Sequence, residues 1–542
     1  MKVHSTDVLI IGGSMAGSCL ARQLKLERPE LTVTVIERKK SFDHGIGESM
    51  LEIFWDYACK DLGLSKYLES NYYYKHGLRF FFEKDNKDTS ITDMSEMGRT
   101  WYHTIPAHQI DRSKFDEDLV AMNEKIGVIT ERGVTATEII IGEDNQQHEV
   151  LASNGKTYQC RWLVDASGLA GALNRKLQDV EKLDVHPVSA AWMRVKGLKD
   201  LDSLGDKEWK QRVRFTNRSL STNHFMYRGY WVWLIPLDAD TYSIGVVWHH
   251  QKSDVSIKSQ KDLEEFLLSH KWAQELFGSD YEIVDFSAIK NMARIAKTIF
   301  SPQRWFRTGM SAGFIDPLFS SGSAWLTDLN RMIVDIIRSD LEMQPEEAEK
   351  KIRGYDLYAH WWYENFLLHI TGNYHGNYEM HKVLFRALLM DYFGIVFPAS
   401  VGEYWKNFAK LNNEELIEIE KNLKSQIMEG GAAFAHKIKD EMAVILEKTG
   451  QPLLNNIKKF HDVEIPSKYM MNAHNRGQKI DENEINNVRQ NIEIESLIEA
   501  TKSIAGLFNR TLSENDLNEL SEKYLQGDIK NLNQGLKDLN LI

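Results

Sequence analysis

Cysteine is scarce in this sequence. Only Cys19, Cys59 and Cys160 occur among 542 residues, far apart and with no CxxC pair. Such cysteines support neither a disulfide framework nor a zinc site. Several histidines occur, among them His249, His250 and His360, but no HExxH motif or carboxylate cluster accompanies them. We therefore expect a protein without a bound metal in a reducing compartment, with the cytoplasm as the default.

Excess positive charge and long apolar runs are also missing. The net charge of -12 argues against non-specific binding to nucleic acid or to anionic lipid. The most apolar later stretch, 387–405, is interrupted by Asp391, Pro398 and Glu403. We expect a buried helix or loop there and no membrane span. The polar N-terminus leads into a strand and a glycine loop, which is not the pattern of a signal peptide.

Hydrophobic and aromatic residues are plentiful. They make up 42% and 11% of the chain, enough for a large core and an aromatic-lined site. The length suggests two to four folding units. Near the N-terminus, an apolar strand over 7–11 precedes a glycine loop, a helical apolar pattern and a β-branched strand over 31–36. Strand, turn, helix and strand form a βαβ unit, so we expect an α/β fold with a parallel sheet.

The glycine loop has the spacing of a dinucleotide-binding turn. Gly12 permits the tight turn, Gly17 lets helix and strand pack closely, and the helix N-terminus then faces a pyrophosphate. Glu37 ends the second strand, where a carboxylate can accept hydrogen bonds from ribose hydroxyls. Ser14 replaces the middle glycine of the usual pattern. The predicted dinucleotide contacts in this segment are Gly12, Ser14, Met15, Ala16, Gly17, Glu37 and Arg38.

Later segments predict further strands and a change of sheet type. The ranges 134–141 and 149–152 read as paired strands, and 161–165 reads as another buried strand. A second, antiparallel sheet is predicted from strands over 212–215, 227–237 and 242–249, of which the last two are joined by a four-residue hairpin at 238–241. After Gly322 the pattern is helical, and beyond about residue 412 it is a Lys/Glu/Asn-rich helical tail without a chemical motif.

Three short motifs indicate which dinucleotide binds. Asp111-Arg112 precedes a helix, and 109–119 resembles the "DR…F…L" helix of FAD monooxygenase-like proteins. Asp165-Ala166-Ser167-Gly168 resembles their "DASG" turn, and Gly309 starts the segment where they carry "GDA". Met310 stands where their aspartate is expected. The resemblance implies FAD, with contacts from Arg112, Asp165, Ala166 and Gly309.

The segment Trp231-Val232-Trp233-Leu234-Ile235-Pro236 narrows the chemistry. Side chains alternate along a strand, so Trp231, Trp233 and Ile235 share one face. Pro236 lacks an amide donor and ends central pairing. The string matches the WxWxIP motif of flavin-dependent halogenases, and the resemblance to that family covers residues 5–400. It implies that Trp231, Trp233 and Pro236 form a barrier between flavin and substrate.

The same resemblance implies a mechanism and its partners. FADH2 from a separate reductase reacts with oxygen and with chloride or bromide to give hypohalous acid, which travels through a tunnel to a lysine beside a small aromatic substrate. Residues 74–80 resemble the segment with the family's active-site lysine, and Lys75 is the matching position. Burial would lower the pKa of its amine and favour a haloamine. The ordinary alternative is a solvated surface lysine, and Arg79 is a nearby second cation.

Two loops resemble the family's flavin-side loops. Residues 45–49 resemble the "G-x-G-E" loop beside the isoalloxazine, which implies contacts from Gly47, Glu48 and Ser49. Residues 313–322 resemble the second flavin-side loop, in which Asp316 contacts the cofactor and the backbone amides of Ser321 and Gly322 hold the halide. Amides before a helix suit an anion. Helix capping by Ser320 or Ser321 is an alternative role for this turn.

Phe319 stands on the substrate side, where tryptophan-type members of the family have a catalytic glutamate. The sequence 316–322 looks instead like the phenol- and pyrrole-type halogenases. A phenol is already activated for electrophilic attack and needs less help from a carboxylate base. We therefore expect a phenolic or resorcinol-like substrate, with a carrier-bound acyl substrate as the other possibility.

The expected architecture is an FAD-binding domain over 1–180 and 285–345, an antiparallel-sheet substrate domain over 181–284, and a helical C-terminal region over 346–542. Three other functions are compatible with parts of the pattern. They are an FAD-dependent aromatic hydroxylase on the same scaffold, a flavin-linked reductase of the isoprenoid-saturating kind, and a flavin-binding protein without turnover.

Overall fold

The computed structural model describes residues 2–83, 87–98, 107–143, 146–211, 213, 217–372, 374, 405–410 and a few isolated positions after 412. The strand expected over 212–215 lies largely outside the described residues, and so do most of the segment 387–405 and most of the tail. No described helix is both long and apolar enough to cross a membrane.

The predicted βαβ unit is present and forms the start of a seven-stranded sheet. Strand order is β7-β2-β1-β10-β9-β8, with β18 also paired to β10. The core of this sheet is parallel, whereas β8 and β9 form an antiparallel hairpin pair. Its elements, with the helix that joins the first two strands, are β1 Lys2–Ile11, α1 Met15–Glu27, β2 Val33–Glu37, β7 Ile129–Arg132, β8 Ala136–Ile140, β9 His148–Ala152, β10 Lys156–Asp165 and β18 Trp305–Arg307.

A second seven-stranded sheet has the order β16-β12-β15-β14-β13-β4-β5. All its pairs are antiparallel except that between β13 and β4, which is parallel. Its strands are β4 Leu78–Phe82, β5 Ser95–Gly98, β12 Val188–Leu198, β13 Thr222–Tyr227, β14 Tyr230–Pro236, β15 Thr241–His249 and β16 Phe277–Ile289. The expected range of 181–284 was therefore too narrow, because two strands come from the N-terminal part of the chain and β16 ends later.

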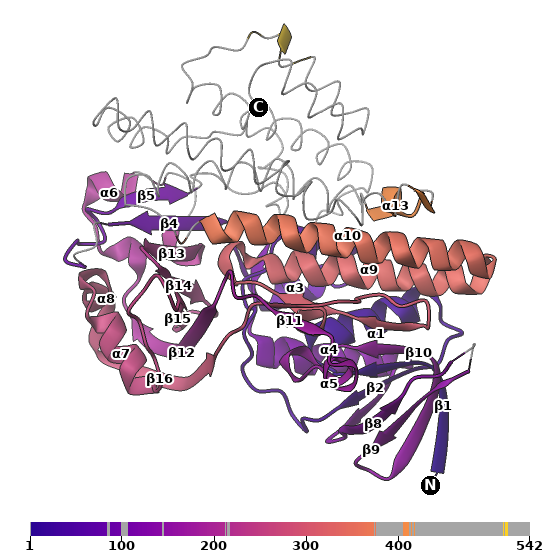
Figure 1. Ribbon diagram of the computed structural model, residues 1–542. Helices are drawn as coiled ribbons and strands as arrows, with labels where there is room; N and C mark the ends of the chain where they lie inside the picture. The colour runs from indigo at the N-terminus through magenta and orange to yellow at the C-terminus, as the bar shows by residue number, and fades with distance from the viewer. Residues whose placement is uncertain are drawn as a thin grey trace.

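Two long helices, α9 Ser321–Glu342 and α10 Pro345–Gly372, run side by side across both sheets (Figure 1). The shorter helices are α2 Glu52–Lys60, α3 Ser65–Asn71, α4 Arg112–Lys125, α5 Ala172–Leu177, α6 Lys207–Gln211, α7 Gln260–Leu268, α8 Lys271–Leu276 and α13 Trp405–Phe408. A small sheet joins β11 Val180–Lys182, β17 Arg294–Ala296 and β19 Gly313–Phe314, and a two-stranded pair joins β3 Tyr73–Tyr74 to β6 His108–Gln109.

The two faces of β14 belong to different cores, as the alternation predicted. Trp231, Trp233 and Ile235 pack in the cluster that contains β1, β2 and α9 side chains. Val232 and Leu234 pack in a second cluster with α7 and α8. The tryptophans therefore face the cofactor-domain side of the second sheet, with both indoles nearly fully buried. Pro236 is the last residue of β14 and is opposite Tyr242.

The glycine loop brings three chain segments into backbone contact. Gly12 has a φ of +110°, and a Cβ atom there would lie 2.4 Å from the carbonyl oxygen of Ala166. A Cβ atom on Gly17 would lie 2.0 Å from the carbonyl oxygen of Gly12. Both glycines are therefore required for β1, α1 and the turn after β10 to approach this closely.

We expect Gly17→Ala to lower the thermal midpoint and to weaken FAD binding, because the methyl group would push α1 away from the loop. Overpacking of this kind costs about 1–3 kcal/mol. The measurement is a melting curve together with flavin fluorescence on titration. Gly278→Ala is a matched control, since the nearest atom to its Cβ would be 3.9 Å away. Equal behaviour of the two variants would contradict the expectation.

Candidate active site

A cavity of about 390 Å³ is lined by side chains from both large sheets, α1 and α9. Many of the residues predicted from the motifs line it, and they come from eight separate segments of the chain. These are Gly12, Ser14, Met15, Ala16, Glu37, Arg38, Gly47, Glu48, Ser49, Arg112, Ala166, Trp231, Trp233, Gly309 and Gly322. The other predicted residues are not part of its lining, namely Gly17, Lys75, Asp165, Pro236, Asp316, Phe319 and Ser321.

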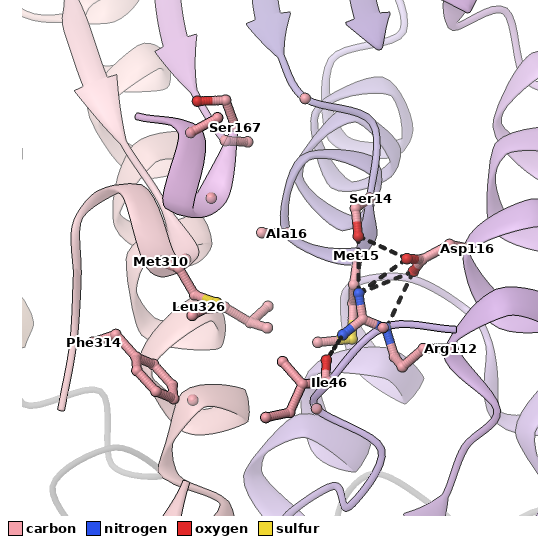
Figure 2. Close-up of a pocket in the computed structure, with 18 of the residues that line it drawn as sticks. Ser14, Met15, Ala16, Ile46, Arg112, Asp116, Ser167, Met310, Phe314 and Leu326 are labelled. Atoms are coloured by element: carbon pink, nitrogen blue, oxygen red, sulfur yellow. Dashed lines mark hydrogen bonds and ion pairs between the residues drawn. The ribbon is translucent and has the colours of Figure 1, made fainter. Parts of the chain in front are cut away.

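Ser14, which replaces the middle glycine, holds the arginine of the "DR" motif. Its hydroxyl donates to Asp116 Oδ2 at 2.7 Å, and Arg112 Nη2 donates to Ser14 Oγ at 2.9 Å. Arg112 Nη1 donates to the carbonyl of Ile46 at 2.6 Å, as Figure 2 shows. The guanidinium is thereby fixed between the glycine loop and the 45–49 loop, where a pyrophosphate can be bound.

Glu37 and Asp165 act on the backbone of their own turns. Glu37 Oε2 accepts from the amide of Gly13 at 2.7 Å, while its other oxygen accepts from the amide of Lys39. The buried Asp165 carboxylate accepts from the amides of Ser167 and Leu173 and so shapes the turn on which Gly12 packs. Asp165 therefore supports the backbone of the turn beside the cavity, and the cofactor contact expected from the sequence stays a prediction.

The residues present fit FAD. The close approach at Gly12 and Gly17 leaves the backbone open to a pyrophosphate, and the N-terminus of α1 is directed at the same place. At Gly309 a Cβ atom would lie 2.9 Å from Ala16 Cβ, so this loop also closes tightly on the helix. Met310 lines the cavity where FAD monooxygenase-like proteins carry an aspartate, so a ribityl chain bound there would meet a thioether.

The indole of Trp233 is anchored to a buried carboxylate. Its Nε1 donates to Ser243 Oγ at 3.2 Å, and Ser243 Oγ donates to Glu48 Oε2 at 3.0 Å. Glu48 Oε1 accepts from Arg194 Nη1 at 3.2 Å. Burial raises the pKa of Glu48 to about 7, against the opposing charge of Arg194. Glu48 therefore lines the cavity as a carboxylate that can hold or release a proton near neutral pH.

The indole of Trp231 is anchored in the same way. Its Nε1 donates to Tyr374 Oη at 2.8 Å, and Tyr374 Oη donates to Asp316 Oδ2 at 2.5 Å. His186 Nε2 lies 3.1 Å from the same carboxylate oxygen. Asp316 is fully buried and its carboxylate is engaged by these groups. The structure thus gives Asp316 a role in orienting the tryptophan, and the cofactor contact expected from the sequence stays a prediction.

The start of α9 has an unusual backbone. Phe319 and Ser320 have φ values of 65° and 57°, in the left-handed region, which a phenylalanine rarely adopts. No side chain caps this helix; instead, the hydroxyl of Ser320 donates to Ser49 Oγ at 2.9 Å. The first amides of a helix have no partner within it, so those of Ser321 and Gly322 are directed outward. Gly322 lines the cavity, and the halide site expected at these two amides stays a prediction.

Lys75 is buried, with 3% of its surface exposed, and is not a surface lysine. Its Nζ donates to the carbonyl of Met50 at 2.8 Å, directly behind a stretch of the cavity wall. Burial lowers the pKa of this amine to about 8, and the charge of Glu52 partly opposes the shift. The neighbouring cation Arg79 forms an ion pair with the buried carboxylate of Glu96.

Several residues of the site had no signal in the sequence. Tyr374, Ser243 and His224 carry no motif, and each acts on a residue far away in the chain. Asp116 could have been found, because it lies four residues after Arg112 on the predicted helix, where an ion pair forms. Among the described residues, no group of three His, Cys, Asp or Glu side chains could hold a metal ion.

Known proteins with similar sequences or similar folds include several flavin-dependent halogenases. The "Lycopene cyclase protein" family model matches residues 7–186. The flavin-dependent halogenase chlA of Dictyostelium discoideum is 26% identical over 74% of this chain and 72% of its own length. The flavin-dependent halogenase armH5 of Armillaria mellea is 27% identical over 78% and 82%. Halogenase PltM, solved with phloroglucinol and FAD, has a TM-score of 0.59 and 18% identity, with coverage of 86% and 98%.

These similarities confirm the resemblance on which the sequence analysis relied. The protein is a homologue of flavin-dependent halogenases and an FAD-dependent enzyme of the oxidoreductase type. Assignment to the phenol- and pyrrole-type members remains a prediction.

We expect Lys75→Met to stabilise the protein at neutral pH. The folded-state pKa of about 8 lies below the ordinary 10.5, so burial of the ammonium costs folding free energy below pH 8, and this cost disappears as pH rises towards 10.5. A shift of this size corresponds to about 3 kcal/mol, and loss of the bond to Met50 offsets about 1 kcal/mol.

Thermal midpoints of wild type and variant at about pH 7 and about pH 10 would test this expectation, with the gain shrinking at the higher pH. Lys66→Met, at an exposed lysine on α3, is the control and should change little. A lower midpoint for Lys75→Met at neutral pH would show that burial of the amine carries no such cost.

Proposed function

We propose that this homologue of the flavin-dependent halogenases transfers halogen to an electron-rich phenolic ring, with Lys75 as the residue that receives the oxidant. The observation that carries the proposal is the burial of the Lys75 amine behind the Ser49–Met50 stretch of the cavity wall. A primary amine is costly to bury, and such a cost is typical of a functional group.

In this proposal the cofactor supplies the oxidant, and residues of the cavity hold the cofactor and the halide. When bound in the reduced form with oxygen and chloride or bromide, FAD supplies hypohalous acid in the cavity. Ser14, Arg112 and the N-terminus of α1 hold its pyrophosphate, and the amides of Ser321 and Gly322 at the start of α9 hold the halide. By the same resemblance, the flavin is reduced by a separate reductase. The few cysteines, none in a disulfide, support a cytoplasmic location.

Lys75 then acts on the oxygen of the hypohalous acid. Near neutral pH its pKa of about 8 leaves the ammonium as the main form, which can donate a hydrogen bond to that oxygen. During transfer a carbon–halogen bond forms and the oxygen–halogen bond breaks. The oxygen takes a proton from Lys75 and leaves as water. The ring releases its own proton to solvent, from which Lys75 is protonated again.

The tryptophan pair would separate the flavin from the aromatic substrate. Both indoles are nearly fully buried, and each is held through one hydroxyl to a buried carboxylate. Because the indoles are fixed in orientation, an aromatic substrate beyond them is kept away from the flavin. Direct oxygen transfer, which a hydroxylase performs, is thereby disfavoured.

A phenolic substrate is supported by Phe319. This residue is fully buried and packs edge to face on Phe80, with ring centroids 6.1 Å apart, so the position offers no carboxylate base. A phenol is activated by its own hydroxyl and can react without one. The neighbour solved with phloroglucinol, a phenol, agrees with this choice of substrate class. Whether the phenol is free or attached to a carrier protein is left open by the proposal.

The test is turnover with reduced FAD, oxygen, chloride or bromide and a set of phenols, followed by mass spectrometry. We expect a halogen isotope pattern on the product. Lys75→Ala should abolish this product, about 10²-fold or more, while oxidation of the flavin continues. Lys66→Ala is the control and should keep wild-type yield. Unchanged halogenation in Lys75→Ala would remove Lys75 from the mechanism, and a halide-independent product one oxygen heavier would indicate a hydroxylase.

We expect Tyr374→Phe to loosen the wall without removing a reacting group. The variant loses the bond between Trp231 Nε1 and the tyrosine hydroxyl, which is worth about 1 kcal/mol. The predicted result is less halogenated product per flavin oxidised and a new oxygenated product, with Lys75 intact. Liquid chromatography with mass spectrometry gives both yields. A product distribution identical to wild type would show that this anchor does not control the barrier.

A further inference from the structure

His224 is a buried histidine on the cavity side of the second sheet. It lies on β13, opposite Trp233 on one neighbouring strand and Phe80 on the other. Only 1% of its surface is exposed, and it contributes to the lining of the cavity. Its ring stacks on Phe80, with centroids 4.5 Å apart and planes at 24°, and its centroid is 5.4 Å from that of Trp231.

The hydrogen bonding of this ring fixes its tautomer. Nδ1 lies 3.1 Å from the carbonyl oxygen of Arg79. A carbonyl oxygen can only accept, so Nδ1 carries the hydrogen and Nε2 has a free lone pair. Burial lowers the pKa of the ring to about 3, and the positive charge of Lys75 acts in the same direction, whereas the Arg79 and Thr222 carbonyls oppose it. The imidazole therefore remains neutral, with an acceptor at the end of the ring away from the backbone.

Lys75 and His224 have complementary hydrogen-bonding capacities. The ammonium of Lys75 can only donate, and Nε2 of His224 can only accept. Lys75 Nζ is held by the carbonyl of Met50, and the hydroxyl of the preceding Ser49 bonds to Thr222, two residues before His224 on β13. Ser49, Met50, Thr222 and His224 line the same cavity, and Trp231 lies beside the histidine. Hypohalous acid has one O–H donor and an oxygen that accepts, so it matches such a pair.

We propose that His224 captures hypohalous acid on its way from the flavin to Lys75, with Nε2 accepting the O–H hydrogen bond while Lys75 Nζ donates to the same oxygen. This inference rests on the proposed function. The pair holds the oxygen between two fixed groups and leaves the halogen as the unengaged end of the molecule. The halogen is then the atom presented to the substrate, and the oxidant is kept from diffusing into solvent.

The main experiment measures where the oxidising equivalents go. Reduced FAD is oxidised in the presence of halide, phenol and a diketone that reacts with free hypohalous acid. For His224→Phe, which keeps the ring stacking but has no acceptor, we expect flavin oxidation within twofold of wild type. The ratio of halogenated phenol to oxidised flavin should fall about fivefold or more, and the halogenated diketone should rise by the same amount.

His224→Gln and His270→Phe serve as matched variants. The amide oxygen of a glutamine can accept near the position of Nε2, so His224→Gln should recover part of the lost ratio. His270 is equally buried but packs in the core on the opposite face of the sheet, where it contacts Tyr230. His270→Phe should lower the thermal midpoint without changing the ratio. A fall as large in His270→Phe as in His224→Phe would overturn the capture role.

A second measurement needs neither cofactor nor turnover. Nitrogen-15 spectra of the flavin-free protein, assigned with His224→Gln, should show Nδ1 protonated and Nε2 unprotonated throughout the pH range in which the protein is folded. Protonation of Nε2, or titration near the ordinary histidine pKa, would overturn the inference. This result holds even if His224→Phe does not fold.

The outcomes separate the two proposals. Wild-type protein that halogenates neither phenol nor diketone would reject the proposed function. Wild-type protein that halogenates the phenol, together with a His224→Phe variant of equal ratio, would reject the capture role alone.

Discussion

The structure depends on holding two indole N–H groups in place inside a core. An indole nitrogen buried without an acceptor is costly, and an indole free to rotate would not form a wall. Trp231 and Trp233 meet both requirements through Tyr374 and Ser243, which connect them to the carboxylates of Asp316 and Glu48. Each of these two series of hydrogen bonds joins the second sheet to a loop that borders the cofactor cavity. The tryptophan pair and the cavity are therefore parts of one hydrogen-bonded framework.

The two anchors differ in what else they touch. Asp316 is removed from the cavity and shares its oxygen with His186, so its chain is a fixed support. Glu48 lines the cavity and has a pKa near neutrality, so its chain ends on a group that can exchange a proton with the contents of the cavity. The tryptophan pair thus has one anchor that is a fixed hydrogen-bond network and one anchor that can change its charge near neutral pH.

Features encoded by short segments could be predicted from the sequence. The glycine loop, the alternation along β14 and the motifs that line the cavity each depend on neighbouring residues, whose periodicity and size restrict the backbone directly. The local sequence does not tell which side chains and amides a carboxylate will bind, so the hydrogen bonds of Asp165 and Asp316 could not be predicted. The partners of Tyr374 and His224 could not be predicted, because they lie on distant strands and loops.

The insertion of β4 into the second sheet has a consequence for synthesis. This strand, with three successive phenylalanines, pairs in parallel with β13, which follows it much later in the chain. While the polypeptide emerges from the ribosome, β4 has no such neighbour until β13 has been made. β5 can pair with one edge of β4 earlier, but the other edge stays open until then, and an open edge on an apolar strand is a site for aggregation. The time between synthesis of β4 and synthesis of β13 is therefore the interval in which we expect aggregation to compete with folding.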